Sequence, residues 1–366
     1  MILLIFVMLV EFLVRLFFPP HLIERKNIAP NELYFKNYPN NIEFVTYPNK
    51  TDNFKPTNNK INSIGIRGPE LAKKSKYRVL NIGDSFVQAD EVSFEDTFGE
   101  ELNSSELDIE FVSHGIASWS PTPEFSWIYH NVDEIKYDEV NLFLCINDFF
   151  KKGTYVNVDE YYRTYANYSE IGIPVSYDIA SFQKTTIREI VKEKSYIYKF
   201  MSFAKSKVIS ALPQSNTPYD QFSVPNQIMM LSDNSETWDL ELEDNVLETL
   251  EVVKKIGVFL EQKNIKLNVL FVPMGLAWED EFGSGKQALS DDWERTKIIS
   301  QKGIELFTKD YLRNHKLNYI DLSKEFDLYK KENKNLTLFY DMDGHWNKNG
   351  HFLVYKILDD HYKGVR

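Results

Sequence analysis

A serine that follows an expected strand is the first residue whose type and position could do chemistry. The motif Gly-Asp-Ser at residues 83–85 comes after an apolar strand predicted over 77–82 and before a helix predicted over 94–102. On such a turn Ser85 presents its hydroxyl at the carboxyl edge of a sheet, with its own N–H near a helix start, suited to a developing oxyanion. Because Gly, Asp and Ser are common turn residues, the motif alone is also typical of a plain turn.

A histidine close to two aspartates is the second candidate. The motif Asp-Gly-His-Trp-Asn at residues 343–347 lies in a polar loop before the last predicted helix. His345 with Asp343 two residues before it can act as a general base with an orienting carboxylate. Two alternatives stay open from the residues alone: a helix N-cap turn that carries a surface histidine, or a metal site made of Asp341, Asp343, His345 and His351.

Two further loops follow predicted strands and could stabilise an oxyanion. Asn147 comes after a strand predicted over 140–145, and a side-chain amide there can donate hydrogen bonds without titrating. The loop at 113–118 ends a strand predicted over 109–113, and its backbone amides could supply another donor. Taken singly, the first is also typical of a strand-ending turn and the second of a plain loop.

The four loops together indicate an active site more strongly than any one of them does alone. In a parallel sheet the carboxyl ends of the strands share one edge, where open α/β sheets bind ligands. A serine, a backbone donor, an asparagine and an Asp–His pair would then meet at that edge. These are the parts that serine ester chemistry requires.

With these motifs the sequence resembles the SGNH (GDSL-like) hydrolase superfamily over residues 62–362. The resemblance lies in Gly-Asp-Ser-Phe at 83–86 and in Asp-Gly-His-Trp-Asn at 343–347. It also includes Asn-Ser-Ile-Gly-Ile-Arg at 62–67, which is similar to the Asn-x-x-Gly-Phe-Arg lead-in of membrane-anchored bacterial members. The fold that it implies is a flavodoxin-like three-layer α/β/α sandwich with a parallel sheet.

The resemblance also implies a role for each site residue. Ser85 would be the nucleophile, His345 the general base and Asp343 the acid that orients the imidazole. The oxyanion donors would be the Ser85 amide, the Ser118 amide and the Asn147 side chain. The reaction would be acyl transfer through an acyl-serine, to water or to a sugar hydroxyl, with no cofactor and no metal.

Three positions depart from the family pattern. Ser118 stands where the second block has glycine and Gly115 lies three residues earlier, so either amide could be the second donor. The common Asp-x-x-His spacing would place the acid where a methionine stands, so Asp343 is preferred and Asp341 is the alternative. Ala89 replaces a glycine that often follows the serine, which puts the local turn in doubt.

The elements that must position these loops alternate along the chain. Further strands are predicted over 267–272 and 318–322, with long helices between them and a final helix over 349–361. The alternation predicts a parallel sheet with helices on both faces. Between residues 150 and 243 it lapses. That stretch is too long for a structureless loop, so we expect an inserted cap near the carboxyl ends of the strands.

The amino terminus differs from the rest of the chain. Its first ~18 residues are apolar apart from Glu11 and Arg15, and a helix of that length comes close to spanning a bilayer. No small-x-small cleavage site follows, so we expect an uncleaved anchor at 1–19; an amphipathic helix is the alternative. Residues 20–75 are rich in Asn, Pro and Lys and are expected to form an extended, loop-rich lead-in to a hydrolase-like domain at 76–366.

Composition narrows the function classes. The 366 residues contain 54 acidic and 42 basic side chains, and the net charge of −12 argues against broad nucleic-acid binding. The single cysteine, Cys145, excludes an intrachain disulfide and a cysteine-rich metal site. Basic residues at and after the apolar run favour a cytoplasmic body, whereas the resemblance favours the outer face of a bacterial cytoplasmic membrane.

The sequence therefore predicts a membrane-anchored serine esterase that acts on an acylated glycan or lipid. An O-acyltransferase that acts on an exported polysaccharide is the alternative within enzymes, because both reactions use the same nucleophile and differ in how water is excluded. A catalytically idle domain that binds a glycan or scaffolds a membrane complex is the alternative from another class.

Overall fold

Five parallel strands form the central sheet of the computed structural model, in the order β11-β10-β7-β5-β6. They are β5 (Tyr77–Gly83), β6 (Ile109–Gly115), β7 (Glu139–Leu144), β10 (Lys266–Phe271) and β11 (Asn318–Ile320). Counted along the chain from β6, the order is 2-1-3-4-5, which is the flavodoxin-like order with its switch point between β5 and β7. The predicted parallel sheet is confirmed.

The structure describes part of the chain, namely residues 10–14, 16–17, 28–46, 55–149, 166–178, 195, 197–198, 200–201, 240–273, 302–333, 336–340 and 344–365. Most of the predicted anchor and most of the predicted insert at 150–243 lie outside these residues. Within them, no helix combines the length and the apolar character that a membrane span needs.

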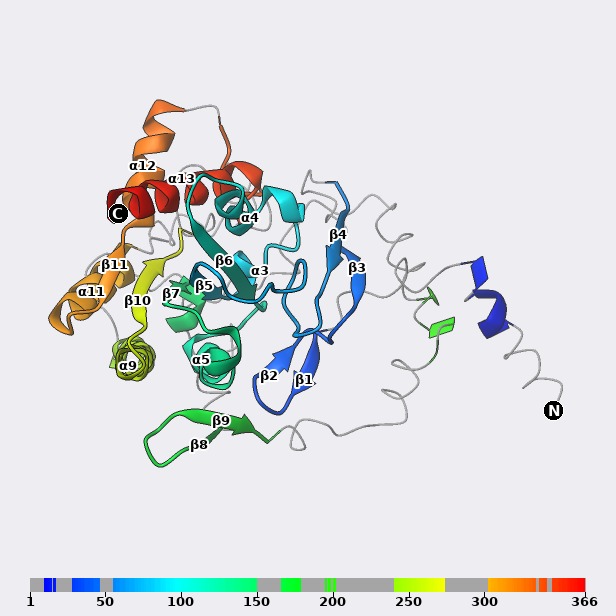
Figure 1. The fold of residues 1–366 in the computed structure, drawn as a ribbon, viewed down its shortest axis with the longest axis horizontal. Coiled ribbons are helices and arrows are strands. Elements are labelled where there is room, and N and C mark those ends of the chain that lie inside the picture. Colours follow the sequence, from blue (N-terminus) through cyan, green and yellow to red (C-terminus); the bar gives the residue numbers. More distant parts are fainter. Residues whose placement is uncertain are drawn as a thin grey trace.

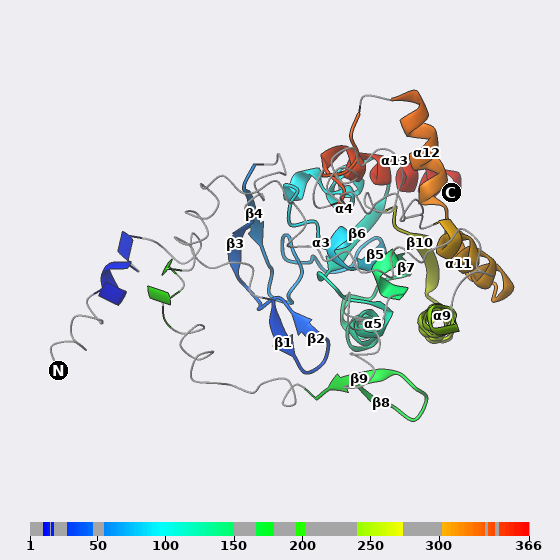
Figure 2. The same ribbon diagram turned by 180° about the vertical axis from the view of Figure 1, so that it is seen from behind.

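Helices cover both faces of the sheet (Figures 1 and 2). On one face lie α5 (Pro121–Ile135) and α9 (Leu240–Gln262), and α11 (Lys302–Asn314) packs against α9 and β11. On the other face lie α4 (Phe98–Asn103), α12 (Leu322–Glu332) and α13 (Lys348–Val365). The predicted placement of helices on both faces is confirmed.

The layers follow from two apolar patterns in the sequence. Every residue of β7 is buried, as expected for a strand covered on both faces. The buried stripe of α9 recurs every three or four residues, which is the spacing of one helix face, and comprises Val246, Leu250, Val253, Ile256 and Leu260.

The helix predicted over 94–102 is wrong as a single element. The chain forms a short 3₁₀ turn, η1 (Phe94–Asp96), and then α4, separated by Thr97 in an extended conformation. The Thr97 hydroxyl donates to the Phe94 carbonyl at 2.7 Å, a local bond that competes with the helical pattern. A further short helix, α3 (Ser85–Gln88), begins at Ser85 itself.

The lead-in also differs from the expected loop-rich segment, because it contains two antiparallel hairpins. One pairs β1 (Ala29–Asn31) with β2 (Phe35–Asn37), and the other pairs β3 (Glu43–Thr46) with β4 (Thr57–Lys60). In β4 the inward-facing side chains are the polar Thr57 and Asn59, both of which donate to the Asp90 carbonyl. The sequence of β4 therefore lacks the alternation of apolar and polar residues by which a strand is predicted.

A third hairpin lies within the predicted insert. It pairs β8 (Ala166–Tyr168) with β9 (Pro174–Tyr177) and packs against α5. His130 Nε2 of α5 lies 2.8 Å from the Val175 carbonyl oxygen of β9. This hairpin was not predicted.

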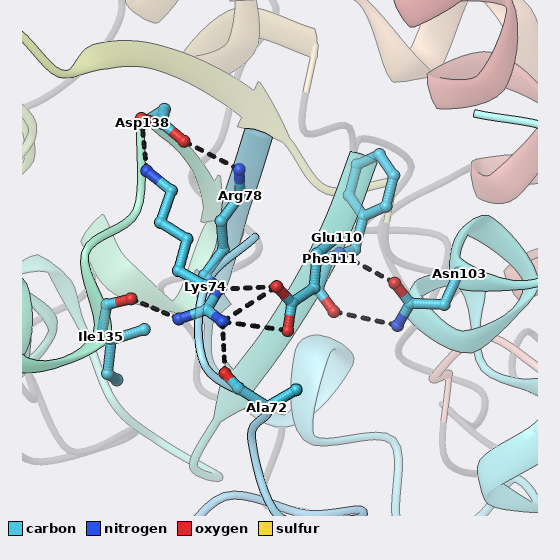
Figure 3. A network of polar contacts seen from close by, with 8 residues as sticks. All are labelled: Ala72, Lys74, Arg78, Asn103, Glu110, Phe111, Ile135 and Asp138. Carbon is cyan, nitrogen blue, oxygen red and sulfur yellow. Dashed lines mark hydrogen bonds and ion pairs between the residues drawn. The ribbon is translucent and has the colours of Figure 1, made fainter. Parts of the chain in front are cut away.

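The amino-terminal edge of the sheet is closed by a partly buried network of polar contacts around Arg78 (Figure 3). The Arg78 guanidinium, at the start of β5, donates to Glu110 of β6 at 2.9 Å and to the Ala72 carbonyl at 2.8 Å. Asp138 accepts from the Lys74 ammonium at 2.6 Å and from the Arg78 backbone N–H at 2.9 Å. Because the buried Arg78 and the half-buried charges around it are paired and hydrogen-bonded, the end of the lead-in is fixed at the edge of the sheet opposite the loops that carry Ser85 and Asn147.

A row of polar side chains crosses the sheet, with its middle members buried and its outer two half-buried (Ser113) and exposed (Asn318). Ser113, Asn81, Asn141, Asn268 and Asn318 occupy paired positions on β6, β5, β7, β10 and β11. Each is bonded to the next: Asn81 Nδ2 donates to Ser113 Oγ at 3.1 Å, Asn141 Nδ2 to Asn81 Oδ1 at 2.8 Å, Asn268 Nδ2 to Asn141 Oδ1 at 2.8 Å and Asn318 Nδ2 to Asn268 Oδ1 at 2.6 Å. This amide ladder fixes the register of all five strands.

Replacing Asn141 with leucine is expected to lower the free energy of unfolding by about 3 kcal/mol, because it removes the buried donor to Asn81 Oδ1 and one of the two acceptors of Asn268 Nδ2, the other being Glu139. Urea denaturation at neutral pH measures the change. Asn167→Leu is the matched control, because Asn167 lies exposed on β8, and it is expected to change stability by less than about 0.5 kcal/mol. Equal effects of the two variants would contradict the importance of the ladder.

Candidate active site

The turn after β5 presents Ser85 at the carboxyl edge of the sheet. Asp84 is the N-cap of α3, and its Oδ1 accepts a hydrogen bond from the Phe86 N–H at 3.0 Å. Ser85 is the first residue of that helix. Gly83 is required before it, because a Cβ there would lie 2.7 Å from the Val87 side chain and 3.2 Å from the Phe143 carbonyl.

His345 meets Ser85 although the two residues are 260 positions apart. The Ser85 Oγ lies 2.7 Å from His345 Nε2, a distance at which the hydroxyl donates to a neutral imidazole nitrogen. The imidazole rests against the Phe86 ring, with 4.6 Å between ring centroids. Phe86 therefore supports the histidine from the residue next to the serine, a contact that the sequence analysis missed.

The loop that carries His345 is held on both sides. Gly344 has a φ of 74° in a turn that is closed by its N–H donating to the Tyr340 carbonyl at 3.0 Å. The Trp346 indole N–H donates to the Pro273 carbonyl, just after β10, at 2.9 Å. Asn347 Oδ1 accepts from two backbone N–H groups at the start of α13, so this motif also forms a helix N-cap.

The two acids considered for the histidine, Asp341 and Asp343, lie outside the described residues. His351, the other member of the metal alternative, is buried in α13 and stacks on Phe98 with 5.8 Å between ring centroids. Burial lowers its pKa to about 3. Within the part of the chain that the structure describes, no group of three His, Cys, Asp or Glu side chains could hold a metal ion.

Asn147 lies on the short 3₁₀ helix η2 (Ile146–Phe149), which follows β7. Its Nδ2 donates to Asp84 Oδ2 at 3.1 Å, and an amide nitrogen has a second hydrogen for a ligand. Asp148 shapes the turn by accepting from the Cys145 N–H at 2.8 Å. Asn147 therefore faces the serine turn from the neighbouring strand, across the switch point of the sheet.

Asp84 does more than form the turn that is typical of the Gly-Asp-Ser motif, and its second role was not predicted from the sequence. Besides capping α3, its carboxylate orients the Asn147 amide. Its side chain is fully buried, and burial raises the pKa of the carboxyl, while the hydrogen bonds from Phe86 and Asn147 and the nearby His345 oppose that rise. The signal in the sequence that could have shown this role is the position of Asp84, directly before Ser85 in the motif.

Gly115 and Ser118 lie in different surroundings. Gly115 ends β6 beneath α3, where a Cβ would come within 2.4 Å of the Asp84 carbonyl oxygen and the Gln88 nitrogen. Ser118 is exposed in the following turn and has a φ of 61°. Glycine is thus needed at 115 for close packing, and Ser118 adopts the left-handed conformation for which glycine is usual.

Ala89 likewise takes the conformation that favours glycine. It ends α3 with a φ of 50°, and its N–H donates to the Ser85 carbonyl at 2.9 Å. The turn that the missing glycine put in doubt is therefore formed.

The arrangement can activate a hydroxyl and stabilise an oxyanion. Ser85, Asn147 and His345 are half-buried, whereas Asp84, Phe86 and Trp346 behind them are buried. A half-buried hydroxyl bonded to an imidazole, with an amide donor across the switch point, is the geometry of nucleophilic serine chemistry.

Comparison with known proteins yields structural likenesses only. No protein-family model matches the chain, and no curated protein matches its sequence. Among solved structures it is similar to a putative lipolytic protein of the G-D-S-L family from Desulfitobacterium hafniense, at 13% identity and a TM-score of 0.39, over 78% of this chain and 98% of that one. A GDSL-like lipase from Bacteroides thetaiotaomicron gives 9% and 0.39, over 81% and 93% of the respective chains.

A single-site mutant of an acetyl-xylooligosaccharide esterase from Geobacillus is similar at 12% identity and a TM-score of 0.36, over 79% of this chain and 95% of that one. Sequence identities and TM-scores this low support no inference about the function of this chain. The functional proposal rests on the geometry of the site.

Proposed function

We propose that the protein is a serine esterase-type hydrolase that cleaves an acyl ester of a glycan or lipid through an acyl-serine intermediate. The observation that carries the proposal is the 2.7 Å contact between Ser85 Oγ and His345 Nε2 at the carboxyl edge of the sheet. The Asn147 amide, held by Asp84 on the neighbouring loop, supports it. An idle domain has no need of a serine paired with a base.

The first half of the reaction forms the acyl-serine. His345 Nε2 takes the hydroxyl proton while Ser85 Oγ attacks the ester carbonyl carbon. The oxyanion of the tetrahedral intermediate accepts hydrogen bonds from the amides of Ser85 and Ser118 and from the Asn147 side chain. The intermediate collapses as His345 gives its proton to the leaving alcohol.

The second half returns the free enzyme. A water molecule, or a sugar hydroxyl in the transferase alternative, gives a proton to His345 as its oxygen attacks the acyl carbon. The second tetrahedral intermediate expels Ser85 Oγ, which takes the proton back from His345. In this scheme Asp343 orients the imidazole, and no cofactor or metal takes part.

We also propose that the domain acts at the outer face of a bacterial cytoplasmic membrane, tethered by residues 1–19. The apolar run at the amino terminus supports the tether, while its basic flank argues for the opposite orientation. A reporter fused to the carboxyl terminus, active only outside or only inside the membrane, decides between the two orientations.

The proposed reaction is tested by mixing the full chain with p-nitrophenyl acetate and following p-nitrophenol and acetate. We expect saturable turnover, with the acyl group passing mainly to water. Added glycerol or an oligosaccharide reports the alternative, because acyl transfer to the acceptor in preference to water would make the protein an acyltransferase. Release no faster than in buffer, with this and with longer acyl chains, would overturn the proposal.

A further inference from the structure

The side chain of Gln88 connects α3, the nucleophile helix that begins at Ser85, to the loop after β6. Gln88 is the last residue of α3, three positions after Ser85, and it is buried. Its Oε1 accepts a hydrogen bond from the Ala117 backbone N–H at 2.8 Å. Ala117 directly precedes Ser118, whose amide is a donor in the proposed mechanism.

The loop that Gln88 contacts is a tight turn. The Trp119 N–H donates to the Ile116 carbonyl at 2.8 Å, which closes a four-residue turn with Ala117 and Ser118 at its centre. Ser118, the third residue of this turn, has a φ of 61°, a left-handed conformation that is unfavourable for a serine. A backbone conformation of this kind persists only where surrounding contacts stabilise it, and the hydrogen bond from the Ala117 N–H to the Gln88 carboxamide is one such contact.

Donors and acceptors around Gln88 permit one orientation of its amide. The Ala117 N–H can only donate, so Gln88 turns its oxygen to that group and its nitrogen to the Tyr38 hydroxyl. The Tyr38 hydroxyl in turn donates to Asp90, whose two oxygens lie at 2.8 and 2.7 Å. Hydrogen bonds in such a chain polarise one another, and here Gln88, Tyr38 and Asp90 are all buried.

Arg67 fixes the far end of this chain. Its guanidinium donates to the Ala89 and Val92 carbonyls, each at 2.6 Å, and its charge interacts with that of Asp90. Arg67 follows a turn in which Asn62 Oδ1 accepts two backbone N–H groups. The lead-in therefore contacts the end of the nucleophile helix through Tyr38 and Arg67.

We propose that Gln88 is a positioning residue, which holds the Ser118 amide in register with the Ser85 hydroxyl and is itself held by Tyr38 and Asp90. This proposal rests on the proposed esterase function, because the register matters for catalysis only if an oxyanion forms between the two loops. A donor that acts on the transition state affects kcat more than KM.

Gln88→Met tests the proposal, because methionine keeps the length of the side chain and lacks the carboxamide. We expect kcat for p-nitrophenyl acetate to fall about tenfold with KM nearly unchanged, less than the loss of a whole oxyanion donor causes. Tyr38→Phe keeps the bond between Gln88 and Ala117, and its loss of kcat is expected to be smaller.

A sulfur probe separates positioning from general destabilisation. The thiono analogue, in which sulfur replaces the carbonyl oxygen, accepts hydrogen bonds poorly, so an intact oxyanion site prefers the oxygen ester. We expect Gln88→Met to lower the kcat/KM ratio of oxygen ester to thiono ester by about tenfold relative to wild type. A purely structural role would lower both values equally and leave the ratio unchanged, which would overturn the proposal.

Hydrogen exchange supplies a readout that needs no turnover. The peptide covering residues 111–121 of the full chain is expected to exchange faster in Gln88→Met than in wild type, and at the wild-type rate in Ser104→Ala, an exposed control. Unchanged exchange in Gln88→Met would overturn the proposal even if no ester were a substrate. Failure of the wild type to turn over any ester would instead count against the proposed function.

Discussion

Ser85→Ala is expected to lower kcat for ester cleavage by about 10⁴-fold or more, with the fold intact. The variant removes the oxygen that would carry the acyl group, so only oxyanion stabilisation and binding remain to accelerate attack by water. Because Ser85 Oγ is bonded to His345 Nε2, the two residues are expected to act as one unit. Steady-state kinetics with p-nitrophenyl acetate measure the loss.

Two controls sharpen this prediction. Ser104→Ala, an exposed serine after α4, is expected to retain full activity. The double variant Ser85→Ala/His345→Ala is expected to be hardly slower than Ser85→Ala alone, because residues that act together are strongly non-additive. More than a tenth of the wild-type kcat in Ser85→Ala, or independent effects of the two substitutions, would contradict a serine–histidine pair.

Acidification is expected to destabilise the protein through two buried histidines. His114 and His351 are both fully enclosed, and burial lowers the pKa of each to about 3. Since an unfolded histidine has a pKa of about 6.5, the unfolded chain binds more protons than the folded one between these values, and stability falls as the pH falls below about 6.5. At pH ~5 each histidine is expected to lower the free energy of unfolding by about 2 kcal/mol, and the two together by about 4 kcal/mol.

Urea denaturation at about pH 8 and pH 5 tests this window. His351→Phe keeps an aromatic ring against Phe98 and is expected to reduce the loss of stability between the two pH values by about 2 kcal/mol. His114→Phe, which keeps an aromatic ring beside Trp127, is expected to do the same. If neither variant changed the difference, protonation of these side chains would not explain the acid sensitivity.

The sheet could be predicted from the sequence because its strands are apolar runs that helices cover on both faces. Ser85 and His345 could be predicted to meet, since each belongs to a motif that places it at the same edge. The structure brings these two together and sets Asn147 beside Asp84. The acid that orients His345 stays a prediction at Asp343.

Other features depended on contacts that local patterns do not carry. The hairpins of the lead-in bury polar residues such as Thr57, so no apolar alternation marked β4. Asn81 and Asn141 are unusual in strands, and only the pairing of the strands shows that they form a ladder. Gln88 binds a backbone N–H across the sheet edge, a partner that leaves no trace in side-chain spacing.

The most direct test of the central claim is labelling of the full chain with a fluorophosphonate, read by intact mass and peptide mapping. The account predicts one adduct per chain, on Ser85, and no adduct in folded Ser85→Ala. Absence of an adduct on the folded wild-type protein, or an adduct that persists in Ser85→Ala, would contradict an activated nucleophile at Ser85.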